Sequence, residues 1–216
     1  MDEAQILEIL KGTGAVITGS HIVYASGRQH GPAYVNKDAI FPHTRITSQL
    51  CRAIADHFWG NDVEVVAGPT QGGAIMAQWV AFWYYRYDYR PPSAPPLAVY
   101  AEEGGEKRVF HRGYDKLISG KRVLVVDDVL TTGGTVRKVV EAVRDLGGKV
   151  VGVGVIANRG KVTAQDVGDV PELFALVDVN MESFAPEECP LCRAGVPINT
   201  ELGRGREFLA KLGQRR

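Results

Sequence analysis

The sequence lacks the features that mark secreted and membrane proteins. It has only three cysteines, Cys51, Cys189 and Cys192, and so small and odd a number provides no disulfide framework. Its most apolar run, Ala74–Tyr85, is far shorter than the roughly 20 residues a helix needs to cross a bilayer. The opening MDEAQILEILKGTG lacks the basic-then-apolar order of a signal peptide. These absences predict a cytoplasmic protein with no membrane partner.

An excess of charge of one sign is also lacking. Lys plus Arg and Asp plus Glu both number 25, so the formal net charge is zero. Because sequence-independent nucleic-acid binding depends largely on neutralised phosphates, this balance argues against a nucleic-acid partner, while allowing a local basic pocket for a small anion. A chain of 216 residues can bury roughly 70% of its unfolded surface, so we expect folding without a metal or disulfide.

Apolar runs alternate with helical patterns through the middle of the chain. Strands are expected at Val63–Ala67, Leu97–Ala101, Arg122–Val126, Lys149–Ala157 and Leu173–Val177, and helices at Thr44–Trp59, Gln71–Trp83 and Thr135–Leu146. Such alternation implies right-handed βαβ crossovers. It therefore predicts an α/β fold with a central parallel β-sheet flanked by helices.

The ends of the chain and two inner segments break this rhythm. Tyr87–Pro96 carries four prolines and is expected to be a surface connection. The polar, glycine-punctuated segment 101–120 shows no pattern of core contacts, which is typical of a lid or a disordered loop. After residue 184 the sequence looks irregular except for a short helix, Gly205–Leu212. We expect a single domain with an N-terminal hood (1–43), an α/β core (44–180) that includes the lid, and a C-terminal tail (181–216).

The strongest chemical signal is VLVVDDVLTTGGT, at Val123–Thr135. An apolar strand leads to Asp127 and Asp128, and a Thr/Gly turn then opens a helix. Ligands bind at the carboxyl ends of parallel strands, and a glycine turn before a helix exposes backbone N–H groups to a phosphate. The carboxylates would repel that phosphate, so vicinal sugar hydroxyls are their natural partners. An ordinary βα turn would not explain why two carboxylates lie beside a phosphate loop.

This run resembles the phosphoribosyl-pyrophosphate signature of type I phosphoribosyltransferases. The resemblance implies that fold and a transferase reaction, with Asp127 and Asp128 acting on the ribose hydroxyls in catalysis. The substrate-binding residues that it implies in this run are Asp127, Asp128, Val129, Leu130, Thr131, Thr132, Gly133, Gly134 and Thr135.

Two further segments match the same family in the same order. GPTQGG, at Gly68–Gly73, is similar to the loop that approaches the pyrophosphate, which implicates Thr70, Gln71 and Gly72. The segment 101–120 takes the place of the lid, which in the orotate enzymes reaches across a dimer interface. The resemblance therefore implies a homodimer, with Lys107 and His111 as catalytic residues and Arg108 and Arg112 as substrate-binding residues. Taken alone, such a charge run is usually a solvated face.

Three features resemble orotate phosphoribosyltransferases in particular. The stretch His21–His43 is similar to their hood, IANRG places Arg159 over the base, and Cys189–Ile198 resembles a tail found in one bacterial branch. Orotate carries a carboxylate, and arginine is its best planar partner. Arg159 is therefore the candidate for the base, with Lys37 or Arg28 contributing from the hood.

The resemblance implies transfer of the ribose 5-phosphate of phosphoribosyl pyrophosphate to orotate, in pyrimidine (UMP) biosynthesis, with Mg²⁺. The ion would be held mainly by the substrate, with Asp127 and Asp128 as indirect contributors. Ala25 and Glu103 depart from the family pattern, which commonly has a basic residue at each place. A purine or nicotinate-like base therefore remains an alternative. A regulator of the same fold that binds nucleic acid is a more distant one.

The cysteines carry a weaker signal. Cys189-Pro190-Leu191-Cys192 has half of a zinc-site spacing, and the sequence contains no second CxxC or HxxxH motif to complete four ligands. Cys51 lies in an amphipathic pattern and is expected in the core. Four thiolates shared across a dimer and a redox pair stay open, but the preferred interpretation is a structural tail.

Overall fold

The computed structural model describes residues 1–24, 29–86, 95–179 and 181–213. The chain forms two compact units, Met1–Ile6 with Phe41–Val179 and Leu7–Ile40 with Asn180–Arg216, here called the core unit and the terminal unit. Both ends of the chain thus contribute to the terminal unit. Ala25 and Arg28, and most of the proline-rich connection, lie outside the described residues.

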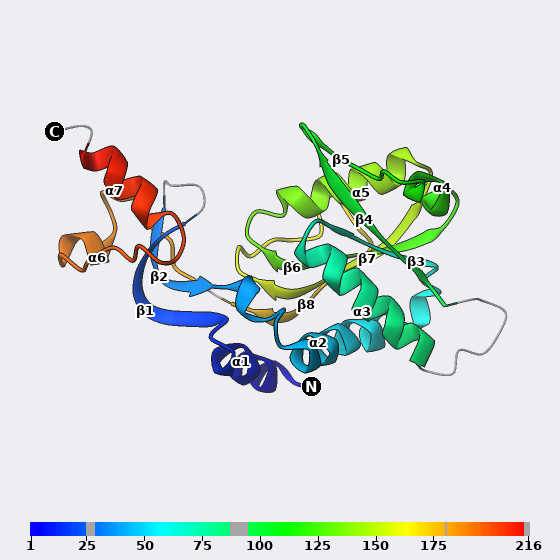
Figure 1. The fold of residues 1–216 in the computed structure, drawn as a ribbon, viewed down its shortest axis with the longest axis horizontal. Coiled ribbons are helices and arrows are strands. Elements are labelled where there is room, and N and C mark those ends of the chain that lie inside the picture. The colour runs from blue at the N-terminus through cyan, green and yellow to red at the C-terminus, as the bar shows by residue number, and fades with distance from the viewer. Residues whose placement is uncertain (25–28, 87–94, 180, 214–216) are drawn as a thin grey trace. The chain divides into compact units, whose positions relative to one another are not determined.

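The core unit contains a six-stranded sheet in the order β5-β4-β3-β6-β7-β8 (Figure 1). Its strands are β3 (Val65–Pro69), β4 (Leu97–Gly104), β5 (Lys107–Val109), β6 (Arg122–Leu130), β7 (Lys149–Asn158) and β8 (Leu173–Asp178). β5 pairs antiparallel with β4, and the other neighbouring strands pair in parallel. The predicted parallel sheet is confirmed, although β6 continues four residues beyond the predicted strand end.

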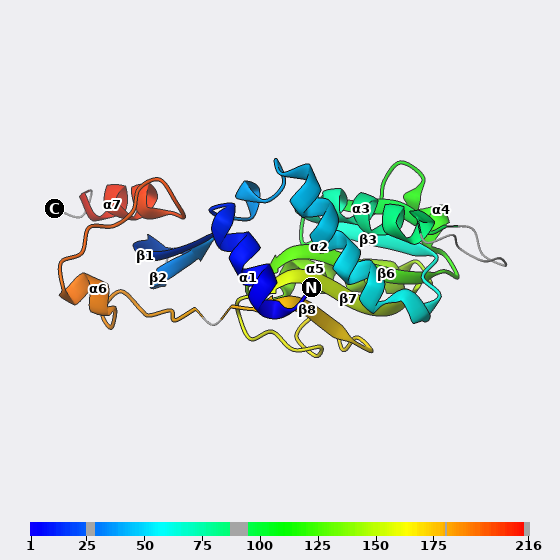
Figure 2. The same ribbon diagram turned by 90° about the horizontal axis from the view of Figure 1, so that it is seen from below.

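Helices cover both faces of this sheet. α2 (Thr44–His57) and α3 (Gly72–Arg86) pack against each other on one face (Figures 1 and 2), whereas α5 (Gly134–Asp145) joins the apolar cluster on the other. Alternate strand residues explain the division, because Val123 and Val125 belong to the α5 cluster. On the α2 face, a side chain at Gly154 would collide with Ile54, so small residues allow close packing there.

The segment 101–120 is more ordered than its composition suggests. β4 and β5 form a hairpin, and α4 (Tyr114–Ile118) follows. Ala101, Phe110 and Ile118 are buried in the apolar cluster. The prediction of an irregular segment without core contacts is therefore wrong, because a few widely spaced apolar residues anchor it among many charges. Whether the hairpin moves like a lid stays a prediction.

The terminal unit is built around an antiparallel pair, β1 (Val16–Val23) and β2 (His30–Val35). The register shifts between Thr18 and Ile22, where Gly19 has a φ of 73°. The tail lies beside this pair through bridges from Ile198 to β1 and from Phe184 to β2. The other elements outside the sheet of the core unit are α1 (Glu3–Gly12), η1 (Lys37–Ala39), η2 (Trp59–Asn61), α6 (Pro190–Arg193) and α7 (Gly205–Gly213).

The short helix expected near the C-terminus is confirmed by α7. α1 begins in the core unit and ends in the terminal unit. Among the described residues, no helix is both long enough and apolar enough to span a membrane.

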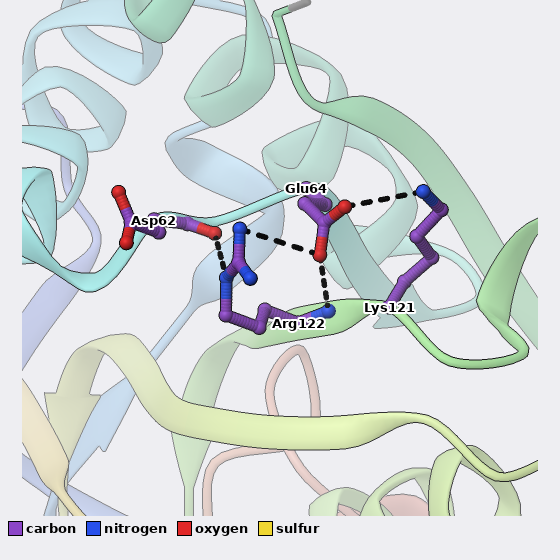
Figure 3. A network of polar contacts seen from close by, with 4 residues as sticks. All are labelled: Asp62, Glu64, Lys121 and Arg122. Atoms are coloured by element: carbon purple, nitrogen blue, oxygen red, sulfur yellow. Dashed lines mark hydrogen bonds and ion pairs between the residues drawn. The ribbon is translucent and has the colours of Figure 1, made fainter. Parts of the chain in front are cut away.

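A network of charged side chains lies at the amino end of the central strands (Figure 3). The Glu64 carboxylate accepts hydrogen bonds from the Arg122 backbone N–H at 3.0 Å and from Lys121 Nζ at 3.1 Å. Arg122 Nε donates to the carbonyl of Asp62 at 2.6 Å. The bond from the Arg122 backbone, with the Lys121 ammonium, lowers the pKa of Glu64. The network joins the chain just before β3 to the start of β6.

Candidate active site

The acidic pair lies inside β6, near its carboxyl end. Asp127 is aligned with Val155 of β7, and the strand continues to Leu130. Successive strand residues leave a strand on opposite faces, and both carboxylates lie near its carboxyl end. Asp128 faces α3, and a side chain at Gly72 would collide with Asp128 Oδ2. The sequence predicted the pair at the strand end but not the place of Asp128 beside Gly72.

Backbone amides orient both carboxylates. Asp127 Oδ1 accepts a hydrogen bond from the N–H of Asp128 at 2.9 Å, and Asp128 Oδ1 accepts one from the N–H of Val129 at 2.7 Å. Asp127 and Asp128 are only 8% and 3% exposed. A buried carboxylate is stabilised by hydrogen-bond donors. A ligand with hydroxyl groups can supply such donors here.

The turn after β6 offers an anion site. Gly133 has a φ of 75° and precedes α5, a helix of 12 residues. Around it, Thr131, Thr132, Gly134 and Thr135 are exposed. The N–H groups of the first helical turn have no intrahelical acceptor, and the helix dipole favours negative charge there. The turn therefore has the form of a phosphate loop, and phosphate binding by it stays a prediction.

A second loop is pressed against the phosphate loop. The Arg159 N–H donates to the carbonyl of Leu130 at 2.9 Å, and a side chain at Gly160 would collide with the Thr131 carbonyl. The Asn158 side chain bonds both the N–H and the carbonyl of Val162, each at 3.0 Å. The half-buried Arg159 is thereby held beside the phosphate loop, and its place over the base stays a prediction. Sequence reasoning missed the bracing role of Asn158, which the motif IANRG already contained.

The GPTQGG loop approaches the acidic pair from β3. Glycine is required at its close contacts, since a side chain at Gly68 would collide with the Gly73 backbone. The Thr70 N–H donates to the carbonyl of Ala101 at 3.0 Å, and the peptide bond between Thr70 and Gln71 is cis. Gln71 is exposed, and Gly72 starts α3 directly beside Asp128. Two loops with exposed polar groups thus flank the carboxylates.

Of the four basic residues predicted in the segment 101–120, Arg108 contacts the GPTQGG loop. Arg108 Nη1 donates to Thr70 Oγ1 at 3.3 Å, and the Arg108 side chain is 12% exposed. Arg112 instead bonds Glu102 through Nε and Nη2, at 3.2 and 3.1 Å. The structure therefore associates Arg108 with the GPTQGG loop and Arg112 with β4.

Lys107 points away from Arg108, because the two are neighbours on a strand. Its side chain is 78% exposed and lies 3.5 Å from Asp145 Oδ2, beside a hollow of about 240 Å³ between β5 and α5. His111 is exposed just before α4. Lys37 lies in η1 of the terminal unit. Catalytic roles for Lys107 and His111, and binding by Arg112 and Lys37, stay predictions.

The parallel sheet, the carboxylates at its carboxyl edge and the two flanking loops define a protein of the phosphoribosyltransferase class. A family model described as a phosphoribosyl transferase domain matches residues 104–188. An orotate phosphoribosyltransferase of Pelotomaculum thermopropionicum is 38% identical over 197 residues, covering 91% of this chain and 95% of the relative. The chain belongs to the orotate phosphoribosyltransferase family.

Solved structures agree with the fold. Mycobacterium tuberculosis orotate phosphoribosyltransferase in complex with 5-phospho-α-D-ribosyl 1-diphosphate superposes with a TM-score of 0.58 at 25% identity, over 82% of this chain and 96% of that one. Adenine phosphoribosyltransferase from Thermoanaerobacter pseudethanolicus has a TM-score of 0.59 at 18% identity, over 80% of this chain and 99% of that one. The fold alone therefore does not decide which base is used.

Proposed function

We propose that the protein transfers the ribose 5-phosphate of phosphoribosyl pyrophosphate to orotate, giving orotidine 5′-monophosphate and pyrophosphate in UMP biosynthesis. The observation that carries the proposal is the approach of Gly72 to Asp128, which sets a carboxylate between two phosphate-binding loops. A sugar with phosphate groups at both ends fits such a site, since its hydroxyls meet the carboxylates. The ligand of the related mycobacterial structure has this chemistry.

Catalysis by these residues is a matter of position and charge. The exposed turn Thr131–Thr135 and the start of α5 hold the 5-phosphate. Asp127 and Asp128 accept hydrogen bonds from the ribose hydroxyls and favour the positive charge that develops at the anomeric carbon as pyrophosphate leaves. Arg108, at the GPTQGG loop, offsets charge on the departing group. Fixing both reactants in this geometry lowers the entropic part of the barrier.

A divalent ion suits the same place. Mg²⁺ prefers oxygen ligands and keeps several waters, and the carboxylates of Asp127 and Asp128 are oxygen donors at the carboxyl edge of the sheet. When bound with the substrate, the ion neutralises charge on the pyrophosphate. Asp127 and Asp128 would hold the ribose hydroxyls in place beside the ion. We therefore expect activity to require Mg²⁺.

Arg159 supplies the recognition of the base. Its backbone is fixed against Leu130, and its guanidinium is the planar partner that the orotate carboxylate needs. The proposal includes a cytoplasmic homodimer, in which the β4–β5 hairpin of one protomer completes the site of its partner, as the family's lid does. Lys107 and His111 would then act on hairpin closure, which excludes water from the reacting centre.

The test is a turnover assay with phosphoribosyl pyrophosphate and Mg²⁺, in which the ultraviolet loss of orotate is followed beside adenine, hypoxanthine and nicotinate. Turnover of orotate alone, abolished by EDTA and restored by Mg²⁺, is the expected result. Turnover of another base would keep the phosphate site and overturn the role of Arg159. Tight binding of phosphoribosyl pyrophosphate without turnover of any base would instead indicate a regulator.

A further inference from the structure

Four side chains with metal-binding atoms converge within the terminal unit. They are His21 of β1, His30 of β2, Cys189 immediately before α6, and Cys192 within α6. One ligand atom from each lies within 4.8 Å of all the others, and three of the four residues are buried. Side chains so far apart in sequence meet only because the tail lies beside the β1–β2 pair.

The distances fit the ligands of a tetrahedral ion. His21 Nε2 lies 3.0 Å from His30 Nδ1, and Cys192 Sγ lies 3.6 and 3.3 Å from these two nitrogens. Cys189 Sγ lies 3.7 Å from His21 Nε2. Bonds of about 2.0–2.1 Å to nitrogen and about 2.3 Å to sulfur separate tetrahedral ligand atoms by roughly 3.3–3.8 Å. These four spacings agree to within a few tenths of an ångström, and the other two pairs lie within 4.8 Å.

The outer contact of His21 sets its tautomer in the way a metal ligand requires. Its Nδ1 lies 2.7 Å from the carbonyl of Val196, which only accepts hydrogen bonds, so Nδ1 carries the proton. The lone pair of Nε2 then points into the cluster. A histidine whose other ring nitrogen donates to a backbone carbonyl is the usual arrangement around bound zinc.

We propose that His21, His30, Cys189 and Cys192 bind one Zn²⁺ as a closed structural centre. Two thiolates and two imidazoles form the soft tetrahedral donor set that zinc prefers, and four protein ligands leave no open position for catalysis. The centre would join the β1–β2 pair to the C-terminal tail. The sequence contains no second CxxC or HxxxH motif, and His21 and His30 supply the second pair of ligand side chains from outside such motifs.

The experiment measures zinc in the full-length protein, purified with a reductant and without a chelator. We expect one zinc per chain in the wild type, and less than about a tenth of that in Cys192→Ser and His30→Gln. Cys51→Ala and His43→Gln are the matched controls, since Cys51 is buried in α2 and His43 is exposed before it. Both controls should keep the zinc.

A second measurement uses only the wild type, in case the ligand variants fail to fold. Removal of zinc with a chelator should lower the unfolding midpoint by roughly 5–10 °C. Addition of Co²⁺ should then produce tetrahedral visible bands with thiolate charge transfer. Reduced wild type that binds neither zinc nor cobalt, or a ligand variant with undiminished zinc, would overturn the centre. So would loss of zinc in the controls. None of these readouts depends on transferase turnover, so the proposed function can fail separately.

Discussion

Carboxylates at the two ends of the central strands have different surroundings. At the amino end, Glu64 is bound by the Arg122 backbone and the Lys121 ammonium, and the network is complete within the chain. At the carboxyl end, Asp127 and Asp128 are buried and oriented by backbone N–H groups beside exposed loops. The first arrangement joins strands together, whereas the second fixes the carboxylates in the orientation that the proposed binding of ribose hydroxyls requires.

The glycine residues also differ between the two ends of the central strands. At the carboxyl end, Gly72 and Gly160 stand where any side chain would collide with the site, at Asp128 and at Thr131 respectively. Around Gly60, near the amino end, nothing lies within 4 Å of an added Cβ. Changes at the carboxyl end should therefore alter activity more than stability, and changes at the amino end the reverse. The predictions below test that division, from the largest expected effect to the smallest.

Asp128→Asn should lower kcat/KM for phosphoribosyl pyrophosphate by about 100- to 1000-fold, because the amide has no charge to offset the developing ribosyl cation. The unfolding midpoint should change little, since the amide oxygen can still accept from Val129. Steady-state kinetics and thermal unfolding measure both. Asp56→Asn, on the exposed side of α2, is the control. Normal turnover by Asp128→Asn would show that Asp128 does not act on the ribose.

Gly72→Ala should lower kcat/KM by roughly 10- to 100-fold, because the new methyl group displaces the Asp128 carboxylate by a fraction of its own size. Gly60→Ala should leave kinetics unchanged. Kinetics of the purified variants make the comparison directly. Equal behaviour of the two variants would show that the position of Asp128 relative to the GPTQGG loop has no part in turnover.

Substitutions of the neighbouring residues Lys107 and Arg108 should change different kinetic parameters. Arg108 already contacts Thr70, so Arg108→Ala should mainly raise KM for phosphoribosyl pyrophosphate, by about 10-fold. Lys107 is directed toward Asp145, and in the proposed mechanism it acts only when the hairpin closes, so Lys107→Ala should mainly lower kcat. Full saturation curves for both variants distinguish the two effects. An unchanged kcat in Lys107→Ala would remove this lysine from the mechanism.

Glu64→Gln should destabilise the fold by about 1 kcal/mol at pH 7 and leave kcat/KM within about twofold. The folded-state pKa of Glu64 is lowered, so its stabilising effect is present above the ordinary glutamate pKa and is lost as the pH falls through the lowered value. Denaturant unfolding of wild type and variant at pH 7 and below pH 4 measures the difference, which should vanish in acid. The exposed Glu106→Gln is the control. A difference that persists in acid would exclude the charge of Glu64 as its cause.

Much of the site was predictable because its parts are contiguous in sequence. The acidic pair and the Thr/Gly turn follow one strand, and Arg159 follows its neighbour, so a parallel sheet must bring them to the same edge. What could not be predicted depends on side-chain direction. The choice of Arg108 over Lys107 at the GPTQGG loop is set by the register of a three-residue strand, β5, which the charge pattern hides.

The sequence by itself determined the α/β alternation, the family and the two loops proposed to hold phosphate, since each rests on local periodicity or on a continuous motif. Only the tertiary structure decided the order within residues 101–120, the place of Asp128 beside Gly72, and the meeting of His21 and His30 with the two tail cysteines. These features depend on contacts between distant segments or on which face of a strand a residue occupies. Neither is expressed in local spacing, and both follow from the way the elements pack.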